Sequence, residues 1–206
     1  MSRDPVFDQG PAAGSAERPP PEEDRTLLQR VARGDREAFA ALYRRFHRPL
    51  FGYLLRVTGR QELAEELVDD VLLVVWRKAA TFEGRSKVSS WVFGIAYRKA
   101  LKRLQRRDRR PHDAPLADAP PAVESHTPER AWDRRERAAA VAEALSTLPP
   151  EQRSVVVLTY YRGLSYPEIA DTLGCPVGTV KSRMFHARRK LAALLPGLGF
   201  GPEDDS

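Results

Sequence analysis

Between Arg25 and Arg110, apolar residues recur at intervals of three and four, which is the spacing of amphipathic helices. The first run continues past Pro49, a residue that can bend or break a helix. The second run is the most regular, and the third begins near Ser89 or Ser90, either of which can serve as an N-cap. In chain order, the apolar positions are Phe39, Leu42, Tyr43, Phe46, Leu50 and Leu54; then Leu63, Leu67, Val68, Val71, Leu72 and Val75; then Trp91, Val92, Ile95, Ala96, Ala100 and Leu104.

Helical spacing returns from about Ala131 to Leu195. One helix there carries Val141, Leu145 and Leu148. The next is expected to open at Pro149-Pro150-Glu151, because proline is tolerated in a first helical turn, and to end at Arg162-Gly163. Neither segment shows the alternation of apolar and polar residues that would predict strands.

The stretch from Leu164 to Arg183 predicts a helix-turn-helix. Ala170 is small enough for a second helix to cross close by. Gly174 permits the left-handed conformation that ends a helix, and Val180 can fill the space between the two helices. Two short helices that cross steeply are the unit that lays its second helix in the DNA major groove.

The predicted fold is therefore all-α, with two small helical domains joined by a flexible acidic linker. From Pro111 to Glu129 the chain has five prolines, four acids and no Lys or Arg, which is typical of a passive tether. The N-terminal segment is rich in Pro, Gly and charge, and we expect it to be disordered. The expected boundaries are 1–24 for this extension, 25–110 for the first domain, 111–130 for the linker, 131–196 for the second domain and 197–206 for the tail.

Charge is distributed unevenly along the chain. Lys and Arg number 34 against 28 Asp and Glu, a net charge of +6. Ten bases and one acid lie between Arg85 and Arg110, and five bases and no acid between Thr172 and Gly201. Either run alone is typical of a solvated face, but two separate basic patches predict two contacts with a polyanion.

The second basic patch lies on the helix that follows Pro176. Its inner face is expected to consist of Val177, Val180, Met184 and Leu191. The other positions offer donors for phosphates and guanine edges, and a ring for thymine methyl groups. The alternative is a basic surface helix of a packed bundle, but the Ala-Gly-Val spacing favours DNA. The candidate DNA contacts are Thr179, Lys181, Ser182, Arg183, Phe185, His186 and Arg189.

The first basic patch combines bases with aromatic residues, after a basic loop from Phe82 to Lys87. This combination suits single-stranded nucleic acid, whose bases can stack or enter a pocket. Most of these bases have no acid four residues away, so we expect no lattice of salt bridges. For Trp91 and Phe93, a place in the core is an equal alternative. The candidate contacts are Arg85, Lys87, Trp91, Arg98, Lys99, Lys102 and Arg103.

A candidate protein-docking face consists of Asp69, Asp70, Leu73 and Trp76. We expect Leu73 and Trp76 to be exposed there, although an ordinary solvated face is the usual interpretation of such a group.

Other classes of function find little support. Cys175 is the only cysteine, so neither an internal disulfide nor a cysteine-based zinc site can form. The four histidines are scattered, and no phosphate-binding loop or catalytic constellation stands out. We therefore expect no enzyme activity, no cofactor and no metal. No apolar run approaches the ~20 residues of a membrane helix, so we expect no membrane insertion and a cytoplasmic location.

Two blocks of sequence resemble bacterial RNA polymerase sigma factors of the extracytoplasmic-function (ECF) type. The first block comprises Ala64–Val71, Val75–Lys78, Phe82 and Ser90–Ala100. The second comprises Leu148–Arg153, Gly163–Ala170 and Gly178–Arg183. Each block alone suggests this family, and the presence of both blocks in this order is specific for it.

The resemblance implies that the first domain grips the polymerase clamp and melts the minus-ten promoter element. Asp69, Asp70, Leu73 and Trp76 match the clamp-binding helix, while the loop from Phe82 to Ser89 and the helix from Trp91 to Arg103 match the minus-ten reader. The second domain would bind the minus-thirty-five element and the polymerase flap. The linker would thread toward the RNA-exit channel, and an anti-sigma factor commonly sequesters such proteins.

Two positions depart from the family pattern: Pro176 replaces a common Ser or Thr cap, and His186 replaces a common Arg.

Two other functions are alternatives for this chain. A helix-turn-helix regulator that does not bind polymerase would use the motif near Val180 equally well, but it leaves Asp69, Asp70 and the linker unexplained. In a scaffold protein, the third alternative, the basic patches would be incidental.

Overall fold

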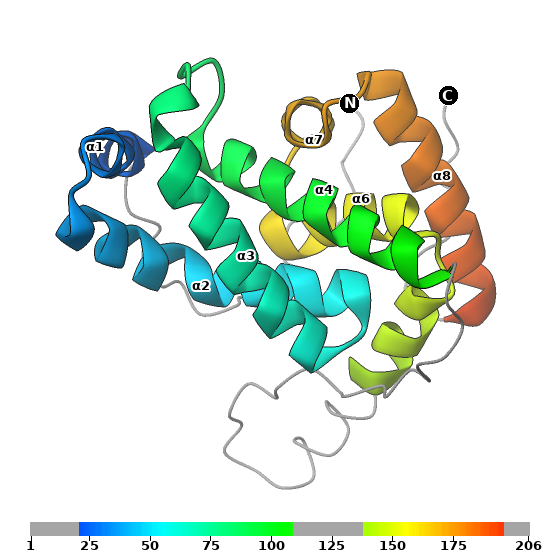
Figure 1. The fold of residues 1–206 in the computed structure, drawn as a ribbon. Coiled ribbons are helices and arrows are strands. Elements are labelled where there is room, and N and C mark those ends of the chain that lie inside the picture. Colours follow the sequence, from blue (N-terminus) through cyan, green and yellow to red (C-terminus); the bar gives the residue numbers. More distant parts are fainter. Residues whose placement is uncertain (1–20, 109–137, 196–206) are drawn as a thin grey trace, which may run out of the picture.

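The computed structural model describes residues 21–108 and 138–195, which contain helices and no strand (Figure 1). The first domain consists of α1 (Pro21–Ala32), α2 (Arg36–Thr58), α3 (Gln61–Lys78), the short 3-10 helix η1 (Ala79–Thr81) and α4 (Val88–Asp108). The second consists of a helix over residues 138–146, then α6 (Pro150–Arg162), α7 (Tyr166–Leu173) and α8 (Val177–Leu194). The all-α prediction is confirmed for the described residues.

Helix α2 passes through Pro49 without a break. The Asp35 carboxylate caps its start by accepting from the backbone N–H groups of Glu37 and Ala38, at 2.9 and 3.0 Å. An interior proline costs a helix about 3 kcal/mol. Phe46, Leu50 and Leu54 lie on both sides of this position and are buried, and each contributes about 1.5–3 kcal/mol on burial. Packing therefore outweighs the local penalty.

Helix α1 begins at Pro21, inside the segment for which the sequence predicts disorder, so that expectation does not hold for residues 21–24. Arg45 of α2 pairs there with Glu23 and Asp24, at 3.0 and 2.8 Å. These acids are distant from Arg45 along the chain, so local composition does not reveal the pairing. Residues 1–20, the predicted linker and the predicted tail lie outside the described residues.

Helix α4 begins at Val88, slightly before the predicted caps Ser89 and Ser90. The Trp91 N–H donates to the Lys87 carbonyl at 3.1 Å, so the first turn starts at Lys87 and not at either serine. Ser90 is buried instead of capping the helix.

The helix-turn-helix prediction is confirmed by α7 and α8. Ser165 and Glu168 form a reciprocal capping box at the start of α7, and Gly174 ends it with φ of 67°. Val180 is fully buried between the helices, and Ala170 is buried beside it. The expected inward position of Val177 is wrong, since 38% of its surface is exposed. Val177 lies in the first turn of α8, before the helix reaches the core.

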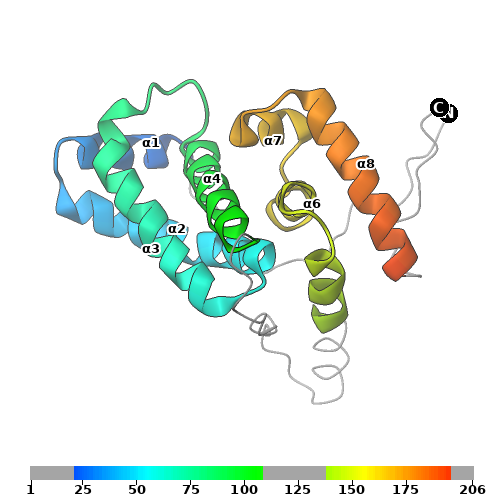
Figure 2. The same cartoon turned by 45° about the vertical axis from the view of Figure 1, so that its right-hand side comes forward.

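The two domains pack directly against each other, with α6 beside α2 and α7 beside α4 (Figures 1 and 2). The Tyr53 hydroxyl lies 3.2 Å from Ser154 Oγ, and both residues are buried. This burial raises the pKa of Tyr53. Tyr53 also meets the Phe93 ring edge-on at 5.4 Å. The interface therefore resembles a continuous core.

A buried arginine joins the domains. The Arg153 guanidinium donates to the carbonyls of Val57 (2.6 Å), Ser146 (2.6 Å) and Leu148 (2.9 Å). Val57 lies at the end of α2, where helix carbonyls lack partners within the helix. Burial lowers the pKa of Arg153, and its contacts bridge the end of α2 to the start of α6.

Candidate nucleic-acid interface

Helix α8 presents one exposed face made of candidate DNA contacts: Lys181, Ser182, Phe185, His186 and Arg189. These positions recur at the spacing that places side chains on one side of a helix. Phe185 is 57% exposed, which is unusual for a large apolar side chain and leaves its ring available to a partner. The opposite face, Val180, Met184, Ala187 and Leu191, is buried against the domain core.

Two candidate residues of α8 lie off this face. Arg183 is half-buried, and its Nη1 lies 3.4 Å from the Tyr97 hydroxyl of α4 and 3.8 Å from Cys175 Sγ. Thr179 is half-buried in the first turn, where its N–H donates to the Pro176 carbonyl at 2.9 Å. No side chain caps this helix start. The structure therefore brings Arg183 toward the other domain instead of grouping it with Lys181 and Arg189.

The bases of α4 fall into two sets. Arg98 and Lys102 are exposed. Lys99 Nζ lies 3.0 Å from Asp70, and Arg103 Nη2 lies 2.5 Å from Glu66, so both pair with acids of the neighbouring helix α3. The expectation that salt bridges are absent is thus wrong for Lys99 and Arg103. The expectation rested on acids four residues away on the same helix, whereas the partners of Lys99 and Arg103 lie on the adjacent helix α3.

Phe93 and Trp91, for which the sequence left core and nucleic-acid contact as equal alternatives, differ in their burial. Phe93 belongs to the core, where it is 2% exposed and the Arg162 guanidinium lies 4.6 Å from its ring centroid. Trp91 is half-buried, with its ring 5.4 Å from that of Phe82. Trp91 therefore packs against Phe82 while part of its surface stays accessible.

The loop before α4 borders a hollow of about 390 Å³ between the domains. Its walls come from α1, the loop, the start of α4 and α7. Arg25 Nη2 of α1 donates to the Gly84 carbonyl at 3.3 Å, and Arg85 pairs with Glu83. The lining residues are Arg25, Phe82, Arg85, Ser86, Lys87, Val88, Ser90, Glu168 and Asp171.

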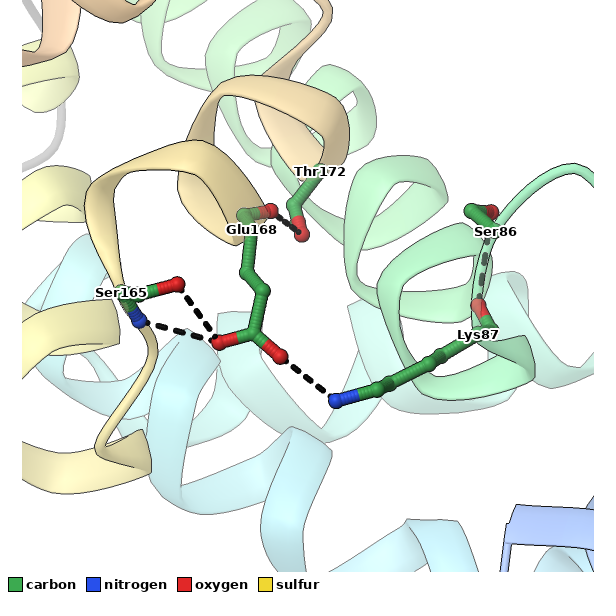
Figure 3. A network of polar contacts seen from close by, with 5 residues as sticks. All are labelled: Ser86, Lys87, Ser165, Glu168 and Thr172. Carbon is green, nitrogen blue, oxygen red and sulfur yellow. Dashed lines mark hydrogen bonds and ion pairs between the residues drawn. The ribbon is translucent and has the colours of Figure 1, made fainter.

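Lys87 is held by an acid of the other domain (Figure 3). Its Nζ lies 2.6 Å from Glu168 Oε1. The second oxygen of Glu168 accepts from the Ser165 N–H and hydroxyl, at 3.0 and 2.9 Å. The bond from Lys87 and then those from Ser165 lower the pKa of Glu168 to about 2. The carboxylate is therefore ionised at neutral pH.

The candidate docking face on α3 is partly packed. Leu73 is 44% exposed, as expected. Trp76 is half-buried, with its ring 5.1 Å from that of Phe39, so the expectation that it is exposed holds only in part. Asp69 accepts from the Tyr43 hydroxyl at 3.2 Å. Burial and the Asp69 charge raise the pKa of Tyr43.

Three residues with a part in this site were absent from the sequence prediction: Arg25, Glu66 and Glu168. The Ser-x-x-Glu pattern at Ser165 is a known signal for a capping box and could have identified Glu168 as a cap. Nothing in the local sequence links Glu168 to Lys87.

Comparison with known proteins agrees with the two-domain layout. Residues 42–110 match the family model described as Sigma-70 region 2, and residues 138–191 match Sigma-70, region 4. The RNA polymerase sigma-H factor of Pseudomonas aeruginosa is 34% identical over 86% of this chain and 96% of its own length. The ECF RNA polymerase sigma factor SigM of Mycobacterium tuberculosis is 40% identical over 86% of this chain and 87% of its own.

A solved structure has a similar fold. The sigma factor RpoE in complex with the anti-sigma factor NepR, from Bartonella quintana, superposes with a TM-score of 0.59 at 27% identity. The match covers 76% of this chain and 96% of that one. Within the described part of the chain, no helix has the length and apolar character needed to span a membrane.

Proposed function

Because the chain belongs to the ECF RNA polymerase sigma factors, we propose how its two domains share promoter recognition. The exposed face of α8 enters the minus-thirty-five element. The loop before α4 and the bases of α4 hold the minus-ten element after the strands separate. The chain directs polymerase to promoters and has no catalytic chemistry of its own. It acts in the cytoplasm, where the polymerase works.

The observation that carries this proposal is the division of α8 into a buried apolar face and an exposed face without acids. Lys181 and Arg189 can neutralise phosphates or bond guanine edges, Ser182 can bond either, and Phe185 can contact thymine methyl groups. Arg183 joins this set only when its contact with Tyr97 is released. His186 lies within this face, and Thr179 borders it in the first turn of α8.

In the minus-ten reader, we assign the first contacts to Arg85, Lys87, Arg98 and Lys102. Lys99 and Arg103 contribute more weakly while they are paired with α3 acids, because a phosphate must compete with an existing carboxylate. Trp91 is only half-buried, so its ring is a candidate for stacking on an unpaired base, an interaction that single-strand binders commonly use.

The polymerase contact is assigned to Asp69, Asp70, Leu73 and Trp76 of α3. Leu73 supplies exposed apolar area, and the two carboxylates beside it suit the polar rim that surrounds the apolar centre of an interface. We also assign this chain an anti-sigma partner, because the RpoE relative from Bartonella quintana is described in complex with one.

Transcription with purified components tests the proposal. The full chain is added to sigma-free core polymerase, and co-elution and run-off transcripts from a library of promoter fragments are measured. Lys181→Ala and Leu73→Ala are expected to reduce transcripts, the first at the promoter step and the second at co-elution. Arg48→Ala, on the exposed side of α2, serves as the control. Tight DNA binding without co-elution would instead support a regulator that does not use polymerase.

A further inference from the structure

Helix α7 of the second domain covers the start of the minus-ten reader. In both views it lies beside α4, and its Glu168 reaches across to Lys87 at 2.6 Å (Figures 1, 2 and 3). Asp171, one turn later on α7, lines the same hollow together with Arg25 and Arg85. Acids of one domain thus face bases of the other.

The backbones of α4 and α7 approach very closely at Gly94. A Cβ atom added at Gly94 would lie 2.7 Å from the Thr172 carbonyl oxygen, a distance at which something must shift. Glycine inside a helix is about 1 kcal/mol less favourable than alanine. Its presence in α4 is explained by this contact with α7, which no larger residue permits.

A carboxylate and a DNA phosphate present similar groups to a lysine, since both are anions with oxygen acceptors that bind ammonium donors. Glu168 is also fixed in place by Ser165, so it meets Lys87 as a pre-oriented acceptor.

We infer that Glu168, with Asp171 beside it, occupies the position of a DNA phosphate on the minus-ten face, so that the free chain inhibits its own binding to single-stranded promoter DNA. This inference rests on the proposed role of Lys87 in binding the minus-ten element. DNA and α7 cannot hold Lys87 at the same time, so the domains must separate before this face is used.

The size of the effect follows from the equilibrium between closed and open chains. The interface includes fully buried side chains such as Ser154, so the open form is the minor one. The apparent affinity for DNA then scales with the open fraction. Loss of an exposed ion pair changes that fraction about two- to fivefold.

Glu168→Gln is the first test, because glutamine keeps the capping box of α7 and removes only the charge. Glu143→Gln is the matched control, since Glu143 is an exposed acid of the same domain and its loss changes the net charge equally. The measured quantity is the affinity of the full chain for a fluorescent single-stranded DNA of mixed sequence. We expect Glu168→Gln to bind about two- to fivefold more tightly than Glu143→Gln. Equal affinities of the two variants would overturn the inference.

Gly94→Ala opens the same contact without any change of charge. The added methyl group collides with the Thr172 carbonyl, so this variant is also expected to bind single-stranded DNA more tightly than the wild type. An unchanged affinity would show that contact between α4 and α7 does not limit DNA binding, and would overturn the inference.

A reversible tether tests closure by itself. The Arg56 guanidinium lies 3.9 Å from the Tyr161 ring centroid, on α2 and α6. A cleavable bis-maleimide between Arg56→Cys and Tyr161→Cys, in a Cys175→Ser background, should form in the free chain and lower its affinity for single-stranded DNA until it is cleaved. Failure to form the tether, or full binding by the tethered chain, would refute self-inhibition. If the tether forms but neither the cleaved chain nor Gly94→Ala binds DNA, the proposed minus-ten role is refuted while closure stands.

Discussion

Replacement of Arg153 by methionine removes the donors that join the two domains but keeps a side chain of similar length. Three carbonyls lose their bonds, and those of Val57 and Leu148 are in buried surroundings. Each buried carbonyl left without a donor costs about 1–3 kcal/mol. The Ser146 carbonyl is partly accessible and regains water. The variant no longer buries a guanidinium charge, and this offsets part of the loss. We therefore expect the free energy of unfolding to fall by about 2 kcal/mol.

Chemical denaturation of the full chain measures this change, with Arg48→Met on the exposed face of α2 as the control. Because Arg153 bonds to both domains, we also expect the unfolding transition to broaden or split as coupling between them weakens. Arg153→Lys should recover part of the loss, since one ammonium group can still reach a carbonyl. A stability of Arg153→Met equal to that of Arg48→Met would refute the reasoning.

Three further predictions concern α7 and α8. Val180→Ala should cost about 2 kcal/mol because Val180 is fully buried, whereas Val177→Ala should change the free energy of unfolding by less than about 0.5 kcal/mol; thermal and denaturant melts compare the two. The pKa of Glu168 is lowered from 4.5 to about 2, so its contribution is complete above 4.5 and is lost as the pH falls toward 2. The difference in melting temperature between wild type and Glu168→Gln should therefore shrink on acidification, and a constant difference would contradict this. Lys181→Ala should weaken binding to a minus-thirty-five fragment and lower the slope of log affinity against log salt by about one; an unchanged slope in a salt titration would exclude a phosphate contact.

Features set by neighbouring residues could be predicted from the sequence. Gly163 and Gly174 end α6 and α7 in the left-handed conformation with φ of 62° and 67°, as their positions after apolar runs indicate. Val180 was identified as the residue between the helices because the spacing of Ala, Gly and Val reports local geometry. The exposed face of α8 follows from the same periodicity.

Contacts between distant residues could not be predicted in this way. The bonds from Lys87 to Glu168, from Arg153 to Val57 and from Tyr53 to Ser154 join positions 81, 96 and 101 residues apart. The local sequence around a serine, an arginine or a glutamate does not indicate a partner on another domain, since each of these residues is also common on a solvated surface. The sequence therefore predicts two separate domains, and only the packed structure shows that one domain covers part of the other.

The ion pairs between α3 and α4 affect how variants of the polymerase face are interpreted. Asp70 is assigned to the polymerase contact, yet its carboxylate lies 3.0 Å from Lys99, which is assigned to the minus-ten element. Asp70→Ala therefore removes a docking group and at the same time releases a base for DNA, and these effects oppose each other in a transcription assay. Glu66 and Arg103 form a second pair of the same kind, at 2.5 Å, without a residue assigned to polymerase. Glu66→Ala thus releases a base, Arg103, without the loss of a docking group, and shows in which direction such a release alone moves transcription.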